Sequence, residues 1–190
     1  MRGNKMKTQL KVIALSVLVA TSAYAEESKG VYFGLGVHQS KVSGEGYKKN
    51  NWKVLVGTRL NSNWSIEGQY ADLATDEGSY TNTKETVKSV VSGNSFGVAG
   101  LYHFNPQGSY SPFVKLGWHH LKTKITRVTT PATGAVVESN ESKSGNHEFY
   151  GVGVDGKINE TIKYRVEYER MNVGEGDDMN NIGVSLLFGF

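Results

Sequence analysis

The sequence contains no cysteine and only three prolines among its 190 residues. The absence of cysteine excludes a disulfide framework and any metal site built on thiolates. Long apolar runs are also missing, because the longest, residues 12–20, falls well short of the ~20 residues that a membrane-spanning helix needs. A chain of this length suffices for one domain, whose stability must come from something other than covalent cross-links.

The amino-terminal 25 residues have the three parts of a secretory signal peptide. The first eleven residues carry four basic side chains and no acidic one, and residues 12–20 are apolar or small. Ala23-Tyr24-Ala25 then matches the A-x-A pattern that precedes a cleavage site. We therefore predict a signal peptide at residues 1–25, cleaved after Ala25, and a mature domain at residues 26–190.

The basic balance of the whole chain belongs to this leader. The chain has 21 basic and 18 acidic residues, a net charge of +3. Removing the four basic residues of the leader leaves 17 against 18, a net charge of −1. The mature domain therefore gives no support to nucleic-acid binding, and we expect no nucleic-acid partner.

From residue 30 onward, apolar residues alternate with small or polar ones with the period of two that is typical of strands. The runs cover residues 30–42, 51–60, 64–71, 94–104, 112–124, 147–158, 162–173 and 180–190. Short turns at 61–63, 105–111 and 159–161 alternate with longer segments at 43–50, 74–93, 125–146 and 174–179, which we interpret as loops. An even number of strands of about ten residues with this alternation predicts an all-β fold, an eight-stranded antiparallel up-and-down transmembrane β-barrel.

Aromatic residues decide which face of the barrel points outward. A soluble barrel of the lipocalin kind has the same period with its apolar face inside. Here the apolar face carries aromatic residues at both ends of the strands and mostly aliphatic residues between them, as expected of two lipid-facing belts. The belt near the long loops is Trp52, Tyr70, Phe96, Trp118, Tyr150 and Tyr168, and the periplasmic belt is Phe33, Trp64, Phe104, Tyr164, Phe188 and Phe190.

The opposite face carries charges of both signs. An eight-stranded barrel is only wide enough for side chains to fill it, so these charges must pair with one another. We predict an interior ion network and a filled lumen, with no cofactor, metal or catalytic residue. Its members are Lys53, Arg59, Glu67, Lys115, Asp155, Arg165, Glu167 and Glu169.

Four segments carry a family resemblance: Gly30–Val37, Ser111–Gly117, Tyr164–Glu169 and Ile182–Phe190. In this order and spacing they resemble the OmpA-like and OmpX-like family of eight-stranded outer-membrane proteins, which includes opacity-type surface proteins. The resemblance implies the cell outer membrane of a Gram-negative bacterium, contact with outer-membrane lipid, and a structural or adhesion and colonisation role without catalysis. It also implies a host or surface ligand at the extracellular loops 74–93 and 125–146.

The final strand resembles the C-terminal signal of bacterial outer-membrane barrels, which the barrel-assembly machinery recognises. Phe190, Phe188 and Leu186 share its apolar face and would form that signal.

Two other functions remain as alternatives. One is a lipid A-modifying enzyme, for which His120 is the best candidate, although position 122 holds a lysine where such enzymes have a serine. The other is a narrow channel, in which Arg165, Glu167, Glu169 and Glu67 would form a gate instead of a static network. His119 and His120 point to opposite faces of a strand and so cannot hold a metal as a local pair. A further hypothesis is that the third to sixth strands extend above the membrane and pair with a partner strand.

Overall fold

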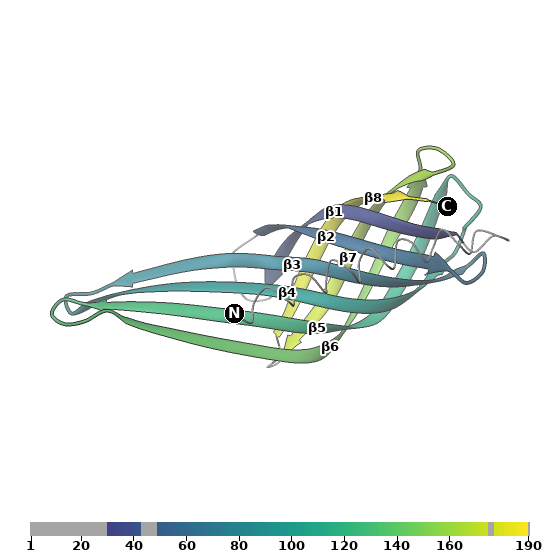
Figure 1. Ribbon diagram of the computed structural model, residues 1–190. Coiled ribbons are helices and arrows are strands. Elements are labelled where there is room, and N and C mark those ends of the chain that lie inside the picture. Colours follow the sequence, from purple (N-terminus) through teal and green to yellow (C-terminus); the bar gives the residue numbers. More distant parts are fainter. Residues whose placement is uncertain (1–29, 43–48, 175–176, 190) are drawn as a thin grey trace, which may run out of the picture.

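The computed structural model describes residues 30–42, 49–174 and 177–189, which form a closed antiparallel barrel with its strands in sequence order (Figure 1). The all-β class and the eight-stranded barrel predicted from the sequence are confirmed. The strands are β1 (Val31–Val42), β2 (Lys49–Arg59), β3 (Trp64–Thr81), β4 (Glu85–His103), β5 (Tyr110–Pro131), β6 (Val137–Lys157), β7 (Ile162–Gly174) and β8 (Asp177–Phe188). Among the described residues, no helix has the length and hydropathy needed to cross a membrane.

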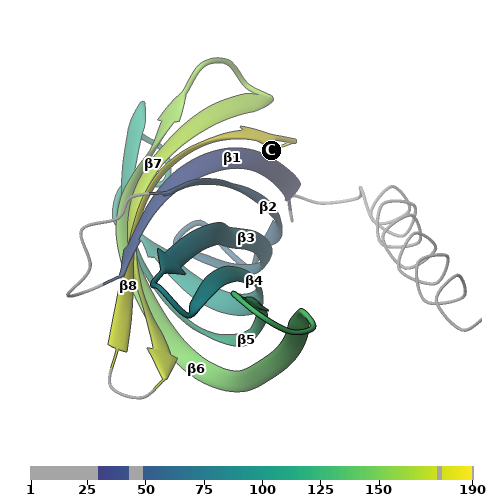
Figure 2. The same ribbon diagram turned by 90° about the vertical axis from the view of Figure 1, so that its left-hand side faces the viewer.

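The barrel closes where the first strand pairs with the last. β1 pairs with β2 on one side and with β8 on the other, and Figure 2 shows the resulting ring. Phe33 lies opposite Phe188 across the β1–β8 seam, and their rings stack with centroids 5.1 Å apart. Closure pairs the backbone around the whole wall and so stabilises the domain without any disulfide.

The two faces of the wall differ as the alternation requires. Val98 and Val152 are 49% and 54% exposed, whereas Glu67 and Arg165 are fully buried. The apolar face therefore points outward and the charged face points into the lumen. A soluble barrel with an apolar core has the reverse arrangement.

Four strands continue far beyond the barrel wall. β3 and β4 form one long hairpin that turns at residues 82–84, and β5 and β6 form a second that turns at residues 132–136. The interpretation of 74–93 and 125–146 as irregular loops is therefore wrong, and the hypothesis that these strands extend is confirmed. β4 also pairs with β5 over this length, so the two hairpins make one four-stranded sheet, here called the extension (Figure 1).

Local sequence explains why the extension is regular. Its β5 segment, from Lys122 to Pro131, is dense in threonine, valine and isoleucine, which favour extended backbone. At the β3–β4 turn, Asn82 Oδ1 accepts hydrogen bonds from the backbone N–H groups of Lys84 and Glu85, both at 2.8 Å. At the β5–β6 turn, Gly134 adopts a φ of 124°, which favours glycine.

Two strands begin within segments that were predicted to be loops, 43–50 and 174–179. β2 begins at Lys49 and β8 at Asp177. Residues 1–29, 43–48, 175–176 and 190, which include the predicted signal peptide and Phe190, lie outside the described residues.

Lumen packing leaves no room for a side chain at Gly117. A Cβ there would overlap the Val98 carbonyl oxygen and lie 2.8 Å from Cε1 of Phe149. We expect Gly117→Ala to destabilise the folded barrel by about 1–3 kcal/mol, because backbone must shift to admit the methyl group. The temperature at which the folded form disappears on a heat-modifiability gel measures this. Gly100→Ala is the control, since a Cβ at Gly100 has nothing within 4 Å, and equal losses in the two variants would contradict the prediction.

Candidate functional site

Arg165 on β7 occupies the centre of the lumen and joins two acidic side chains. Its guanidinium donates a bidentate pair to Asp155 on β6, with Nε 2.7 Å from Oδ1 and Nη2 3.0 Å from Oδ2. Its Nη1 lies 2.6 Å from Oε1 of Glu67 on β3. The guanidinium also lies over the ring of Phe113, 4.5 Å from the centroid. Each of the three nitrogens of this guanidinium therefore donates to a carboxylate oxygen.

Lys115 on β5 extends the network across the lumen. Its Nζ lies 3.2 Å from Glu67, 2.8 Å from Glu167 and 3.0 Å from Glu169. Lys53 on β2 pairs with the same two β7 carboxylates, Glu167 and Glu169. The ion pairs therefore form one chain across the lumen, in which acidic and basic side chains alternate from Asp155 on β6 to Lys53 on β2. Each of the four carboxylates contacts at least one cation.

Tyr32 adds the first strand to the network, since its hydroxyl donates to Glu67 Oε1 at 2.7 Å. Sequence reasoning missed this tyrosine as a partner. The sequence did contain a sign that Tyr32 faces the lumen. It alternates with the apolar residues of β1 and so lies on the face that points inward, between two glycines. The three cations and four carboxylates are 0–3% exposed, so together with Tyr32 they link β1, β2, β3, β5, β6 and β7 through the barrel centre.

Two histidines of the lumen, His103 and His119, are hydrogen-bonded to serines. His103 contacts the hydroxyl groups of Ser65 at 3.1 Å and Ser111 at 3.3 Å. His119 contacts Ser95 Oγ at 2.9 Å and the Asn172 carbonyl oxygen at 2.9 Å. No group of three or more potential metal ligands occurs among the described residues.

The structure brings together seven of the eight residues predicted for the interior network. They are Lys53, Glu67, Lys115, Asp155, Arg165, Glu167 and Glu169. Arg59, the last residue of β2, is half-buried and donates to the Ser62 carbonyl oxygen at 3.2 Å.

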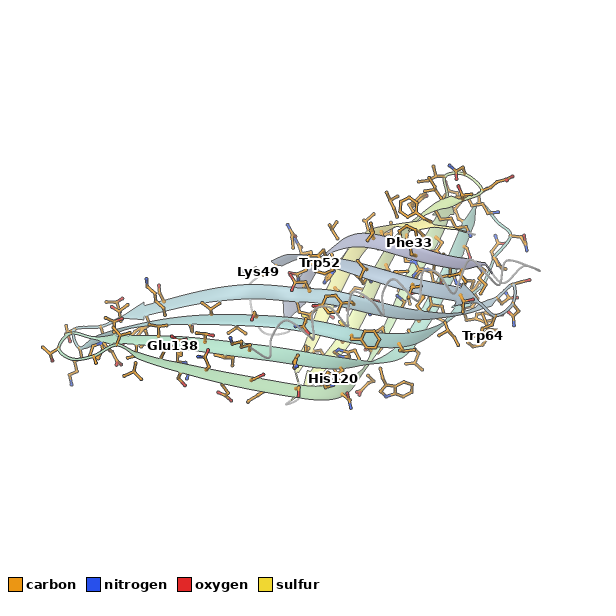
Figure 3. The ribbon with its side chains drawn as sticks, viewed as in Figure 1. Phe33, Lys49, Trp52, Trp64, His120 and Glu138 are labelled. Atoms are coloured by element: carbon orange, nitrogen blue, oxygen red, sulfur yellow. The ribbon has the colours of Figure 1, made fainter. Side chains whose placement is uncertain are left out.

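The predicted belt residues that the structure describes, all except Phe190, lie on the outer surface in two groups. Trp52 lies near the base of the extension and Trp64 at the opposite end of the barrel (Figure 3). Trp52 packs on Tyr70 with ring centroids 5.4 Å apart, and Trp64 meets Tyr102 edge-on at 5.1 Å. Phe33, Phe96, Phe104, Trp118, Tyr150 and Tyr168 are exposed, and Tyr70, Tyr164 and Phe188 are half-buried. Tyr102, which also contacts Phe104, is an additional aromatic residue of the second group.

His120, the candidate for lipid A chemistry, is exposed on the outer face of β5 and labelled in Figure 3. Its Nδ1 lies 2.8 Å from Oδ1 of Asn146, so the ring nitrogen donates to an amide oxygen. Lys122 follows it on the same face, and among the described residues no serine or acidic side chain is hydrogen-bonded to His120.

The extension presents two open backbone edges. The last β2–β3 pair is Lys53 with Ala71, and the last β6–β7 pair is Phe149 with Met171. Within the described part of the chain, residues 72–81 of β3 therefore pair only with β4, and residues 137–148 of β6 pair only with β5. The β6 edge is roughly 40 Å long at ~3.3 Å per residue.

The sequence of residues 12–190 matches the family described as outer membrane protein beta-barrel domain. The chain belongs to this family. Its location in the outer membrane, predicted from the strands and their resemblance, is thereby confirmed, whereas the cleavage site stays a prediction. No curated protein matches this sequence.

Solved outer-membrane barrels share the fold. The structure of Ail, the attachment invasion locus protein of Yersinia pestis, in complex with the heparin analogue sucrose octasulfate is 18% identical, with a TM-score of 0.60 over 86% of this chain and 100% of that one. The N-terminal β-barrel domain of Pseudomonas aeruginosa OprF is 16% identical, with a TM-score of 0.52 over 83% and 97%. Neisserial surface protein A is 14% identical, with a TM-score of 0.55 over 87% and 100%. Such identities show a common fold alone.

Proposed function

We propose that this outer-membrane protein binds a ligand outside the cell through the extension and performs no catalysis. The observation that carries the proposal is the pair of open edges, residues 72–81 and 137–148, held on a regular four-stranded sheet. An open edge presents a row of unpaired N–H and C=O groups, to which an extended segment of another protein can add as a further strand.

The barrel supports this role as a rigid base. Its lumen is crossed by the ion network, and its wall is closed, so the extension has a fixed point of attachment. A regular sheet costs less ordering entropy on binding than an irregular loop would, because its backbone is already fixed. Ail, which has the same fold, is the attachment invasion locus protein of Yersinia pestis, and an attachment role for the present chain accords with that likeness.

Shortening the hairpins in register tests the proposal. One variant lacks residues 76–81 and 86–91, which face each other across β3 and β4, and a second lacks 125–129 and 137–141 of β5 and β6. We expect the combined variant to lose at least tenfold in adhesion of expressing bacteria to host cells, because six of the ten residues of the β3 edge and five of the twelve residues of the β6 edge are gone. Heat modifiability should stay unchanged, since the barrel wall is untouched.

The control for hairpin shortening changes only the β5–β6 tip, residues 132–135, to glycine and serine and so keeps both edges. It should adhere as the native protein does. Full adhesion by the combined shortened variant would contradict a binding role for the extension, and loss of adhesion by the control would assign binding to the tip instead of the edges.

The filled lumen predicts that the protein does not act as a channel. Lys115 and Arg165 hold the carboxylates of three facing strands across the barrel centre, and leaving any of these groups unpaired would be costly. We expect purified protein in planar lipid bilayers to give no steady single-channel conductance. Reproducible unitary steps would favour the gated-channel alternative.

A further inference from the structure

Where the extension leaves the barrel, the outer face of β5 carries one aromatic side chain followed by three polar ones. Trp118, His120, Lys122 and Lys124 occupy alternate positions and all are exposed. Trp118 is the last aromatic residue of this face of β5 and is 67% exposed. Neither lysine takes part in an ion pair with another described residue, in contrast to Arg170 with Asp178 on the neighbouring part of the wall.

The residues beside the two lysines are uncharged hydrogen-bonding groups. Across the strands, Lys122 and Lys124 face Asn94 and Ser92 on β4, and Ser144 and Ser142 on β6. Two ammonium groups therefore stand among hydroxyl and amide groups, with no carboxylate at any facing position. Hydroxyl, amide and ammonium donors together match the several acceptor oxygens of a phosphate.

Two acidic residues on this face, Glu148 and Glu138, lie further along the strands and have partners of their own. Glu148 faces Trp118 and accepts a hydrogen bond from Asn172 at 3.1 Å. Glu138 faces Val128, well along the extension, and accepts from Asn140 at 3.0 Å. Asp72 lies opposite Asn94, so the width of β4 separates it from Lys122 on β5. Neither lysine forms an ion pair with a carboxylate of the described residues, so both ammonium groups can bind an external anion.

The position of the lysines relative to the membrane identifies the anion. Trp118 is the outermost aromatic residue of its strand, and such residues lie at the boundary between hydrocarbon and headgroups. Lys122 is four residues further on, ~13 Å along the strand and about 10 Å along the membrane normal at the usual tilt. A lysine side chain reaches back toward the interface along its own stem, so its ammonium lies at headgroup level.

We propose that Lys122 and Lys124 bind the phosphate groups of the glycolipid in the outer leaflet, with Asn94, Ser92, Ser144 and Ser142 binding the adjoining sugar. The site lies on the continuous surface that runs from the outward aromatic residues onto the extension, so the lipid contacts the protein on both its apolar and its polar part. It would fix the height and tilt of the extension above the membrane, independently of any ligand at the open edges.

The experiment titrates the folded mature protein in dodecyl maltoside micelles with bisphosphorylated lipid A and follows tryptophan fluorescence. The double variant Lys122→Gln/Lys124→Gln should bind about twenty-five times more weakly, since each lysine near an anionic surface contributes about a fivefold factor. The control Lys84→Gln/Lys143→Gln removes the same charge from the tip and from the inner face of the extension. It should bind within twofold of the native protein.

Two further arms identify the phosphate and its source. In the first arm, the native protein should bind lipid A without phosphates as weakly as the double variant binds bisphosphorylated lipid A. In the second arm, inorganic phosphate alone should produce no fluorescence change. Equal affinity of the native protein and the double variant would overturn the proposal, as would equal binding of the two lipid A forms. A response to inorganic phosphate alone would overturn the assignment to a glycolipid.

Discussion

Replacing Arg165 with methionine is expected to destabilise the folded barrel by about 3–5 kcal/mol, the usual cost of removing one partner from a buried ion pair. Arg165 is fully buried, and both oxygens of Asp155 and one of Glu67 lie within 3.0 Å of its guanidinium. Glu67 retains Lys115, but Asp155 loses its two short contacts with a cation. The urea concentration at which the heat-modifiable band shift is lost measures the effect.

A compensated variant separates the loss of charge balance from the loss of packing. Arg165→Met combined with Asp155→Asn and Glu67→Gln removes the uncompensated charges, and we expect it to recover most of the lost stability. Lys143→Gln is the surface control, since this lysine side chain is 60% exposed and its ion pair with Glu141 spans 4.0 Å. That change should have an effect below about 1 kcal/mol. If Arg165→Met were as stable as the native protein, the ion network would have no structural role.

The second large effect is expected at Val166, on the outer face of β7 halfway between Tyr164 and Tyr168. Val166 is 45% exposed, and the residues facing it are also valines, Val154 and Val184. If this face meets hydrocarbon, Val166→Arg should destabilise the barrel by about 2–4 kcal/mol, the cost of an arginine at the bilayer midplane. Unfolding in urea from lipid vesicles measures the difference.

Asn140→Arg serves as the matched control for Val166→Arg. Asn140 is exposed on the outer face of β6, further along the extension than the proposed glycolipid site, where the surface meets water. An arginine there should change stability by less than about 0.5 kcal/mol. Equal effects at the two positions would contradict the placement of the barrel wall in lipid.

The barrel could be predicted from the sequence because the outer and inner faces of its wall meet different environments. Apolar residues such as Val98 face outward and charged residues such as Glu67 face inward, so period-two alternation reveals each strand and its ends. The same alternation grouped seven members of the ion network on one face before any contact was known. It could not pair them, because contacts such as Lys53 with Glu169 depend on how the strands are staggered around the ring.

The extension could not be found by alternation, because both of its faces meet water. Lys122 and Lys124 lie on one face of β5 and Arg127 on the other, so the polar pattern there is typical of a loop. Two weaker signals were present in the sequence. One is the density of threonine, valine and isoleucine, and the other is the pairs Val90-Val91 and Val136-Val137 within otherwise polar segments. Propensity without a buried face predicts a strand only weakly, which is why the length of β3 to β6 required the structure.

The central claim is that the apolar outer face meets hydrocarbon while the extension stands in water, and the absence of native cysteine allows a direct measurement. Single cysteines at positions 166 and 140 of the protein in lipid vesicles, each carrying a nitroxide spin label, can be compared for collision with oxygen and with a water-soluble nickel chelate. We predict that the label at 166 collides with oxygen and is shielded from nickel, and that the label at 140 shows the reverse. Nickel access at 166 equal to that at 140 would contradict the account.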